Sequence, residues 1–200
     1  MSRVCCTDCH RPKIACICDF ITSTTNEIHV VALVHPNEIK QAKGTLPLLS
    51  KSLNNCTVIE GENFTNNQVF NDLLMQYKDE VVLLYPSEQA IKLPAVYKTD
   101  NYNTDSQISR CRCLIILDGT WKKSYRMYQL SLNLHHIPHF VLPDNLVGQY
   151  KIRKTMKKNA LSTLEACCYA LEILENEPDK YQTLLNNFVQ FNHFQLSFRP

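Results

Sequence analysis

The stretch "LIILDGTW", residues 114–121, is an apolar run that ends abruptly at an acid, a glycine, a threonine and the only tryptophan of the chain. Together with the preceding residues it predicts a buried strand over residues 111–118. An aspartate at a buried strand end costs desolvation free energy unless it is paired, and a neighbouring tryptophan offers a large flat wall. We therefore expect Asp118 and Trp121 to border a crevice that suits a cationic or aromatic ligand.

On both sides of this stretch, the chain alternates between apolar runs and segments of helical spacing. Further strands are predicted over residues 27–34, 56–61, 80–88 and 139–143. Helices are predicted over residues 46–55, 66–78, 120–131, 161–175 and about 179–193. Residues 91–110 show little periodicity and are predicted to form a long surface connection.

Two of the predicted helices have an explicit apolar face. In residues 66–78 the spacing places Val69, Leu73 and Tyr77 on one side. In residues 161–175 the apolar stripe consists of Leu164, Cys168, Leu171 and Leu174. These stripes are expected to pack against a sheet.

Strands that alternate with helices and are apolar on both faces predict an α/β fold, with a mainly parallel sheet and helices on both faces. Four strands end in polar turns: "HPNE" (35–38), "YPSE" (85–88), "DGTW" (118–121) and "LPDN" (142–145). In a parallel sheet these turns lie at one edge, where ligands bind.

Composition limits the class of protein. At 200 residues the chain is long enough for one main domain with a substantial core. It contains no run of about 18 apolar residues, and its N-terminus is polar and rich in cysteine, so we expect a soluble, unsecreted, cytoplasmic protein. The formal net charge of +2 does not by itself indicate a nucleic-acid partner.

Four of the ten cysteines, Cys6, Cys9, Cys16 and Cys18, follow a C-x2-C-x6-C-x-C pattern. In a reducing cytoplasm this spacing favours structural Zn²⁺ held by four thiolates over disulfides, with free or redox-active thiols as the alternative. Cys5 is adjacent to Cys6 and is an alternative ligand. We expect residues 1–22 to form a zinc-binding segment and residues 23–200 the main domain.

Three motifs have both a structural and a functional interpretation. His35 and Glu38 suit either an acid/base pair or a simple turn. Ser162 and Glu165 have the spacing of a capping box at a helix start, which alone would explain both residues. The basic segment 150–158 is either a solvated surface or, because it lies near the predicted crevice, a phosphate-binding loop.

Taken in order, these motifs resemble the DTW-domain family, named for its Asp-x-Thr-Trp motif. The resemblance rests on "C-x2-C-x-R-P-x3-C-x-C", "HPNE", "LLYPSEQA", "LDGTWKKSYRM" and "YKIRK" followed by "LSTLEA", and it spans roughly residues 6–175. The resemblance therefore covers nearly the whole chain, and the occurrence of several short motifs in the same order argues against a chance match.

The resemblance implies a tRNA-uridine aminocarboxypropyltransferase. Such an enzyme moves the 3-amino-3-carboxypropyl group of S-adenosylmethionine to N3 of a tRNA uridine and releases 5′-methylthioadenosine. It also implies a SPOUT-like DTW domain over residues 23–200, with a C-terminal trefoil knot. The expected partners are therefore tRNA and S-adenosylmethionine, and no membrane or obligate protein partner is expected.

The resemblance further implies the site residues. The transfer site would contain Asp118, Thr120 and Trp121, with Asp118 as proton acceptor or orienter and Trp121 as a shield. The cofactor pocket would contain Tyr85, Pro86, Ser87, Trp121, Leu142, Pro143, Leu161, Ser162 and Thr163. The substrate-binding residues would be His35 and Glu38, near the donor tail or the target base, and Lys122, Lys123, Arg126, Arg153 and Lys154, at tRNA phosphates.

Two other functions compete with this expectation. A SPOUT-type methyltransferase would use the same fold and the same sulfonium donor but deliver a methyl group. A zinc-containing RNA-binding protein without catalysis would also explain the cysteines and the basic segment.

Overall fold

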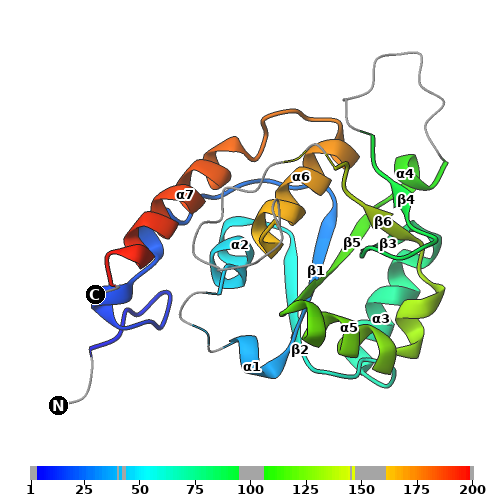
Figure 1. Ribbon diagram of the computed structural model, residues 1–200, viewed down its shortest axis with the longest axis horizontal. Coiled ribbons are helices and arrows are strands. Elements are labelled where there is room, and N and C mark those ends of the chain that lie inside the picture. Colours follow the sequence, from blue (N-terminus) through cyan, green and yellow to red (C-terminus); the bar gives the residue numbers. More distant parts are fainter. Residues whose placement is uncertain are drawn as a thin grey trace.

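The computed structural model describes residues 4–39, 41, 44–94, 106–144, 146 and 161–198. Its described strands form one six-stranded sheet in the order β2-β1-β5-β3-β6-β4, and every pairing is parallel. In Figure 1 helices α2, α6 and α7 lie on one side of this sheet, and α3 and α5 lie on the other. The predicted parallel α/β architecture is therefore confirmed.

The elements have the following bounds. The strands are β1 (His29–Val34), β2 (Cys56–Glu60), β3 (Val81–Leu84), β4 (Ile91–Lys92), β5 (Cys113–Asp118) and β6 (His139–Val141). The α-helices are α1 (Pro36–Ile39), α2 (Leu46–Ser52), α3 (Gln68–Tyr77), α4 (Ser106–Arg110), α5 (Trp121–Leu130), α6 (Thr163–Glu175) and α7 (Gln182–Leu196). Short 3-10 helices are η1 (Lys13–Ala15), η2 (Cys18–Phe20), η3 (Lys78–Glu80) and η4 (Leu132–His136).

The central strands β1 and β5 are buried on both faces because their apolar residues alternate between two cores. In β1, Val30 and Ala32 pack into the core beneath α2, α6 and α7, whereas Val31 and Leu33 pack into the core beneath α3 and α5. Side chains of a strand point alternately to opposite faces, so a continuous apolar run is what a strand between two helical layers requires.

The region 91–110 was wrongly predicted as only a surface connection. Its described part contains β4, which pairs in parallel with β6, and the short helix α4. Leu93 and Ile108 are buried in the core. A strand of two residues is too short to produce a periodic pattern, which is why the sequence did not indicate it.

The predicted face of α3 was only partly correct. Phe70 is fully buried there, with Leu73 and Tyr77 packed against the same core, whereas Val69 is 57% exposed. The last three residues of the "HPNE" segment also belong to the short helix α1 (Pro36–Ile39) rather than to a simple turn. By contrast, the predicted stripe of α6 is confirmed, since Leu164, Cys168, Leu171 and Leu174 are all buried.

The N-terminal cysteine segment packs against the end of the chain. The Phe20 ring lies 5.9 Å from the Phe191 ring and 5.3 Å from the Phe194 ring, centroid to centroid. Ile17 is fully buried in the same core, and Figure 1 shows this segment beside α7. The cysteine segment therefore shares its apolar contacts with the main core.

Two expectations concern the whole chain. The predicted trefoil knot depends on the path of residues 147–160, which lie outside the described residues. Among the helices that are described, none has the length and apolarity needed to cross a membrane.

Candidate functional site

A pocket of about 540 Å³ lies at the carboxyl ends of β3, β5 and β6 and is closed on one side by the start of α6. Its lining residues are Leu84, Tyr85, Pro86, Ile116, Leu117, Gly119, Trp121, Ser124, Phe140, Val141, Leu142, Pro143, Asp144, Leu146, Leu161, Ser162, Thr163 and Ala166. In size and largely apolar lining it resembles sites for small molecules and cofactors. Of the four turns predicted to meet at this edge of the sheet, "YPSE", "DGTW" and "LPDN" contribute residues to this lining, whereas "HPNE" contributes none.

Asp118, the last residue of β5, is 7% exposed; it is not one of the lining residues but lies between two of them, Leu117 and Gly119. Its Oδ1 accepts a hydrogen bond of 2.7 Å from the hydroxyl of Thr163, the first residue of α6. The first turn of an α-helix carries a partial positive charge that stabilises an anionic side chain. The buried carboxylate that the sequence predicted is therefore paired, as its burial requires.

Residues 119–121 connect β5 to α5. Thr120 is the N-cap of α5, and its hydroxyl accepts from the backbone N–H of Lys123 at 3.4 Å. A Cβ at Gly119 would lie 3.2 Å from the Lys123 Cβ, so a small residue suits this close approach. Trp121 begins α5 and lines the pocket with 59% of its surface exposed, which is consistent with an open aromatic wall.

All the residues predicted to hold a cofactor line this pocket except Ser87. The Ser87 hydroxyl lies 2.7 Å from Nδ1 of His139 and borders a second groove instead. Ser162 and Glu165 form the capping box of α6: the Ser162 Oγ accepts from the Glu165 amide and the Glu165 carboxylate accepts from the Ser162 amide. The structural interpretation of Glu165 is thus confirmed.

His35 and Glu38 do not form the acid/base pair that the sequence left open. The 8% exposed His35 places Nε2 3.2 Å from Oε1 of Glu62, and its Nδ1 accepts from the backbone N–H of residue 37. Glu38 instead accepts a 2.7 Å bond from Nζ of Lys123. Because Nδ1 accepts a hydrogen bond, the Nε2–H group of His35 is the donor in the hydrogen bond to Glu62.

Glu62 was missed in the sequence analysis. It joins His35 to Arg126, whose Nε lies 2.8 Å from the Glu62 Oε1. Burial opposes ionisation of Glu62, but hydrogen bonding to His35 and the charge of Arg126 lower its pKa below the usual value. Glu62 follows the end of β2, so the rule that polar residues gather at carboxyl ends of parallel strands would have indicated it.

Of the five residues predicted to contact tRNA phosphates, three lie on α5 and are described. Lys122 is exposed there, while Lys123 and Arg126 are paired with the carboxylates of Glu38 and Glu62. Arg153 and Lys154 lie outside the described residues.

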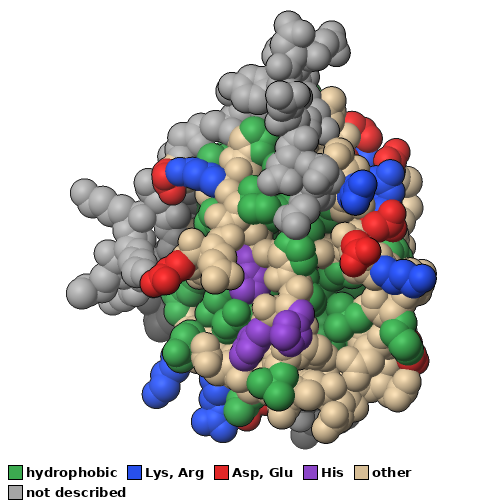
Figure 2. All heavy atoms as spheres, turned by 90° about the vertical axis from the view of Figure 1, so that its right-hand side faces the viewer, with side chains coloured by type: hydrophobic (Ala, Val, Ile, Leu, Met, Phe, Trp, Pro, Cys, Tyr) green, Lys and Arg blue, Asp and Glu red, His purple; other side chains and the backbone are tan. Residues whose placement is uncertain are grey.

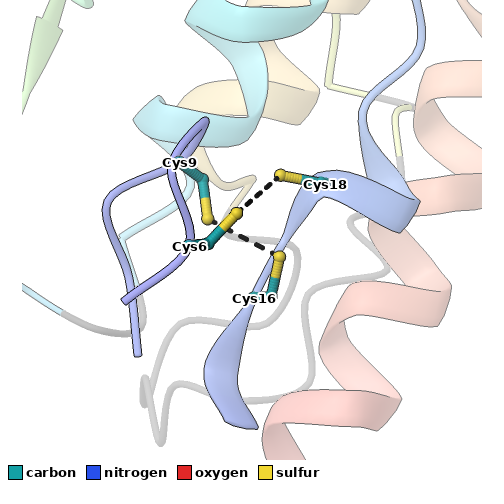
Figure 3. A group of neighbouring side chains, drawn as sticks. All are labelled: Cys6, Cys9, Cys16 and Cys18. Atoms are coloured by element: carbon teal, nitrogen blue, oxygen red, sulfur yellow. Dashed lines mark hydrogen bonds between the residues drawn. The ribbon is translucent and has the colours of Figure 1, made fainter. Parts of the chain in front are cut away.

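The sulfur atoms of Cys6, Cys9, Cys16 and Cys18 all lie within 4.8 Å of one another. In Figure 3 the four side chains point toward a common centre from two separate loops. The Sγ atoms of Cys6 and Cys18 are 3.6 Å apart, and those of Cys9 and Cys16 are 3.7 Å apart. Four sulfurs around a tetrahedral Zn²⁺ would be separated by about 3.8 Å. The cluster therefore has the size and the donor set of a metal site.

Backbone hydrogen bonds favour the thiolate form of two of these cysteines. Amides of Cys9 and Asp8 hydrogen-bond the Cys6 sulfur and lower its pKa. At Cys9 burial acts in the opposite direction, but amides of Ile17 and Arg11 outweigh it and the pKa falls to about 6. Hydrogen bonding with Cys16 raises the pKa of Cys18 to about 12, because crowded thiols cannot all ionise without a cation.

Comparison with known proteins gives a consistent result. Relatives include proteins named tRNA-uridine aminocarboxypropyltransferase 2 from Drosophila melanogaster, Macaca fascicularis and Mus musculus, each 29% identical over 96% of this chain. The aligned region spans 74% of the Drosophila protein and 63% of each of the other two. No solved structure matches the chain. The model of the DTW domain matches residues 3–196, and the chain therefore belongs to the DTW-domain family.

Proposed function

We propose that this protein is an S-adenosylmethionine-dependent tRNA-uridine aminocarboxypropyltransferase. The observation that carries the proposal is the lining of the 540 Å³ pocket by Trp121, with the buried Asp118 between the lining residues Leu117 and Gly119, in a chain whose relatives bear that enzyme's name. A buried, hydrogen-bonded carboxylate and an exposed indole at one strand end suit proton transfer next to a cationic donor.

The size and the lining of the pocket support S-adenosylmethionine as its ligand. Apolar side chains such as Leu142, Pro143 and Leu161 would enclose the adenine, and Tyr85 and Pro86 would form the opposite wall. Ser162 and Thr163 add hydroxyl groups at the N-terminus of α6. Bound S-adenosylmethionine supplies an electrophilic γ-carbon next to its sulfonium.

The proposed reaction forms a bond from uridine N3 to that γ-carbon and breaks the bond between the γ-carbon and sulfur. The N3 proton leaves, and neutral methylthioadenosine carries away the electron pair of the broken bond. Asp118 accepts the proton or orients the base, while Thr163 and the start of α6 hold its carboxylate. Trp121 shields the methyl group and attracts the sulfonium through its π-face.

The chain's remaining polar groups position the RNA in this proposal. Lys122, Lys123 and Arg126 contact phosphates, together with Arg153 and Lys154 of the basic segment. The network through Glu38 and Glu62 orients two of these cations. His35 and Glu38 remain predicted contacts of the donor tail or the target base.

Zn²⁺ in the cysteine cluster has a structural role in this proposal. The four sulfurs leave no open coordination position for chemistry, and the cluster lies on the segment that packs against α7. We infer a cytoplasmic location from this reduced-thiol site, since such clusters need a reducing compartment.

Incubation of unmodified tRNA with the protein and S-adenosylmethionine labelled in its methionine carbon chain tests the proposal. Nucleoside analysis by mass spectrometry should find one labelled aminocarboxypropyl group on uridine and an equal amount of methylthioadenosine. A gain of a methyl group would identify a methyltransferase instead. Binding of tRNA that is independent of S-adenosylmethionine, with no product at all, would identify an RNA-binding protein.

A further inference from the structure

A second groove, of about 830 Å³, lies directly beside the first pocket. Tyr85 and Pro86 line both, so the turn after β3 is the wall between them. The groove is bounded by residues of that turn and of α5: Tyr85, Pro86, Ser87, Glu88, Gln89, Tyr125, Tyr128 and Gln129. None of the cofactor-pocket residues beyond the shared wall contributes to it.

The lining of this groove differs in chemistry from that of the first pocket. Among the described residues it contains three tyrosines, two glutamines, a serine and a glutamate, and neither Lys nor Arg. Tyrosine rings provide flat π-faces, while amide, hydroxyl and carboxylate groups provide both donors and acceptors. Such a lining suits a planar, uncharged group with polar edges rather than a phosphate.

The aromatic groups of this groove are held in place. The Tyr85 and Tyr128 rings stack with centroids 4.6 Å apart and an interplanar angle of 18°. Tyr128 also contacts the rings of His135 and His139, at 4.7 Å and 5.3 Å. The Ser87 hydroxyl is fixed by His139 at 2.7 Å. On the face drawn in Figure 2, histidines likewise gather among hydrophobic and uncharged groups, with charged side chains nearer the margins.

One face of α5 connects the two cavities. Trp121, Tyr125 and Tyr128 have the i, i+4, i+7 spacing of a single helical face, with Trp121 in the first pocket and the tyrosines in the groove. Tyr125 is 59% exposed, so its ring has surface available for stacking. The helix rises about 6 Å between Trp121 and Tyr125. Stacked bases are about 3.4 Å apart along a strand, so a rise of about 6 Å suits two neighbouring bases that are splayed apart rather than stacked.

We propose that this groove binds the unpaired nucleobase next to the target uridine and stacks it on Tyr125. This inference rests on the proposed function, because it assumes that the uridine enters the first pocket. Single-stranded RNA is recognised by splaying bases onto aromatic side chains and bonding their polar edges, which is the combination that Tyr125, Gln89, Gln129 and Glu88 present.

The test compares the binding of unmodified tRNA by the unsubstituted protein and by Tyr125→Ala. Loss of one base–aromatic stack should weaken binding about 5- to 150-fold, without altering the salt dependence, because no phosphate contact is lost. Tyr125→Phe keeps the π-face and should retain most of the affinity. Val69→Ala, at an exposed apolar position of α3, is the matched control and should bind like the unsubstituted protein.

An unmodified tRNA with an abasic residue beside the target uridine, the position labelled in the transfer assay, gives the second arm. It should bind the unsubstituted protein more weakly, and Tyr125→Ala should weaken it little further, since both changes remove the same contact. Equal tRNA binding by the unsubstituted protein and Tyr125→Ala, or fully additive losses, would overturn the proposal. Failure of the proposed function would give a different result. In that case no labelled uridine forms with the unsubstituted protein or with any variant, whereas the binding comparison still decides the role of Tyr125.

Discussion

The Thr163 hydroxyl donates a 2.7 Å hydrogen bond to the Asp118 carboxylate, which links the start of α6 to the end of β5 across 45 positions of the chain. Thr163→Val keeps the side-chain shape but removes the donor. A hydrogen bond to a charged group contributes about 1.5–3 kcal/mol, so we expect aminocarboxypropyl transfer to slow by about ten- to a hundred-fold. Single-turnover kinetics with labelled donor measure this, and Thr163→Ser should restore most of the rate.

Asp118→Ala should abolish transfer while the protein remains folded. The carboxylate is at the edge of the core, and its removal leaves one hydroxyl without this acceptor, at a cost of about 1–3 kcal/mol in the free energy of unfolding. Mass spectrometry of the tRNA, alongside thermal unfolding, separates the two effects. Turnover close to normal in this variant would exclude Asp118 from the chemistry.

Trp121→Ala should weaken S-adenosylmethionine binding about 2- to 30-fold, the range expected for loss of a contact between a cation and an indole face. The ring is 59% exposed, so the melting temperature should change little. Calorimetric titration gives the affinity, and Trp121→Phe should retain part of it. An unchanged affinity in the alanine variant would place the donor elsewhere.

Removal of a metal from the cysteine cluster should destabilise the contact between the N-terminal segment and α7. Because the pKa of Cys9 is lowered to about 6, thiolate is available for a metal at neutral pH. We expect elemental analysis to find one zinc per chain and a chelator to lower the melting temperature by several degrees. Cys9→Ser should lose the metal, whereas Cys5→Ser should retain it if the four clustered sulfurs are the ligands.

Stability should fall on mild acidification because of His29. Burial lowers its pKa from 6.5, while its ring nitrogens lie 3.0 Å from the Tyr77 hydroxyl and 2.8 Å from the Thr57 hydroxyl. The unfolded chain then binds the proton more tightly than the folded one, so the free energy of unfolding decreases as pH drops below about 6.5. His29→Gln should reduce this decrease in the free energy of unfolding, as measured by urea titrations at several pH values. An identical pH dependence would mean that other groups cause the loss.

The parts of the fold that were predicted correctly are those in which a long pattern repeats. Six-residue strands such as β1 and β5, and the stripe of α6, leave a continuous signal because several side chains pack against the same neighbours. The β4 strand and the burial of Phe70 in place of Val69 depend on contacts between distant segments. Such tertiary contacts have no local signature.

The candidate site shows the same division. Asp118 stands out in the sequence because an acid that ends an apolar run needs a partner, but nothing local identifies Thr163 as that partner. The pairing of His35 with Glu62 rather than Glu38 likewise arises because β1 and β2 are neighbours in the sheet. The hydrogen bond between the Ser87 hydroxyl and His139 was not predictable, since it depends on the pairing of β3 with β6.

The contact of Phe20 with Phe191 and Phe194 has a consequence for biosynthesis. The cysteine segment leaves the ribosome well before α7, the helix that covers it. A nascent chain can therefore gather its four thiols around an ion early, but the Phe20 ring stays uncovered until α7 has also emerged. Docking of this ring would then follow the assembly of the metal site rather than precede it.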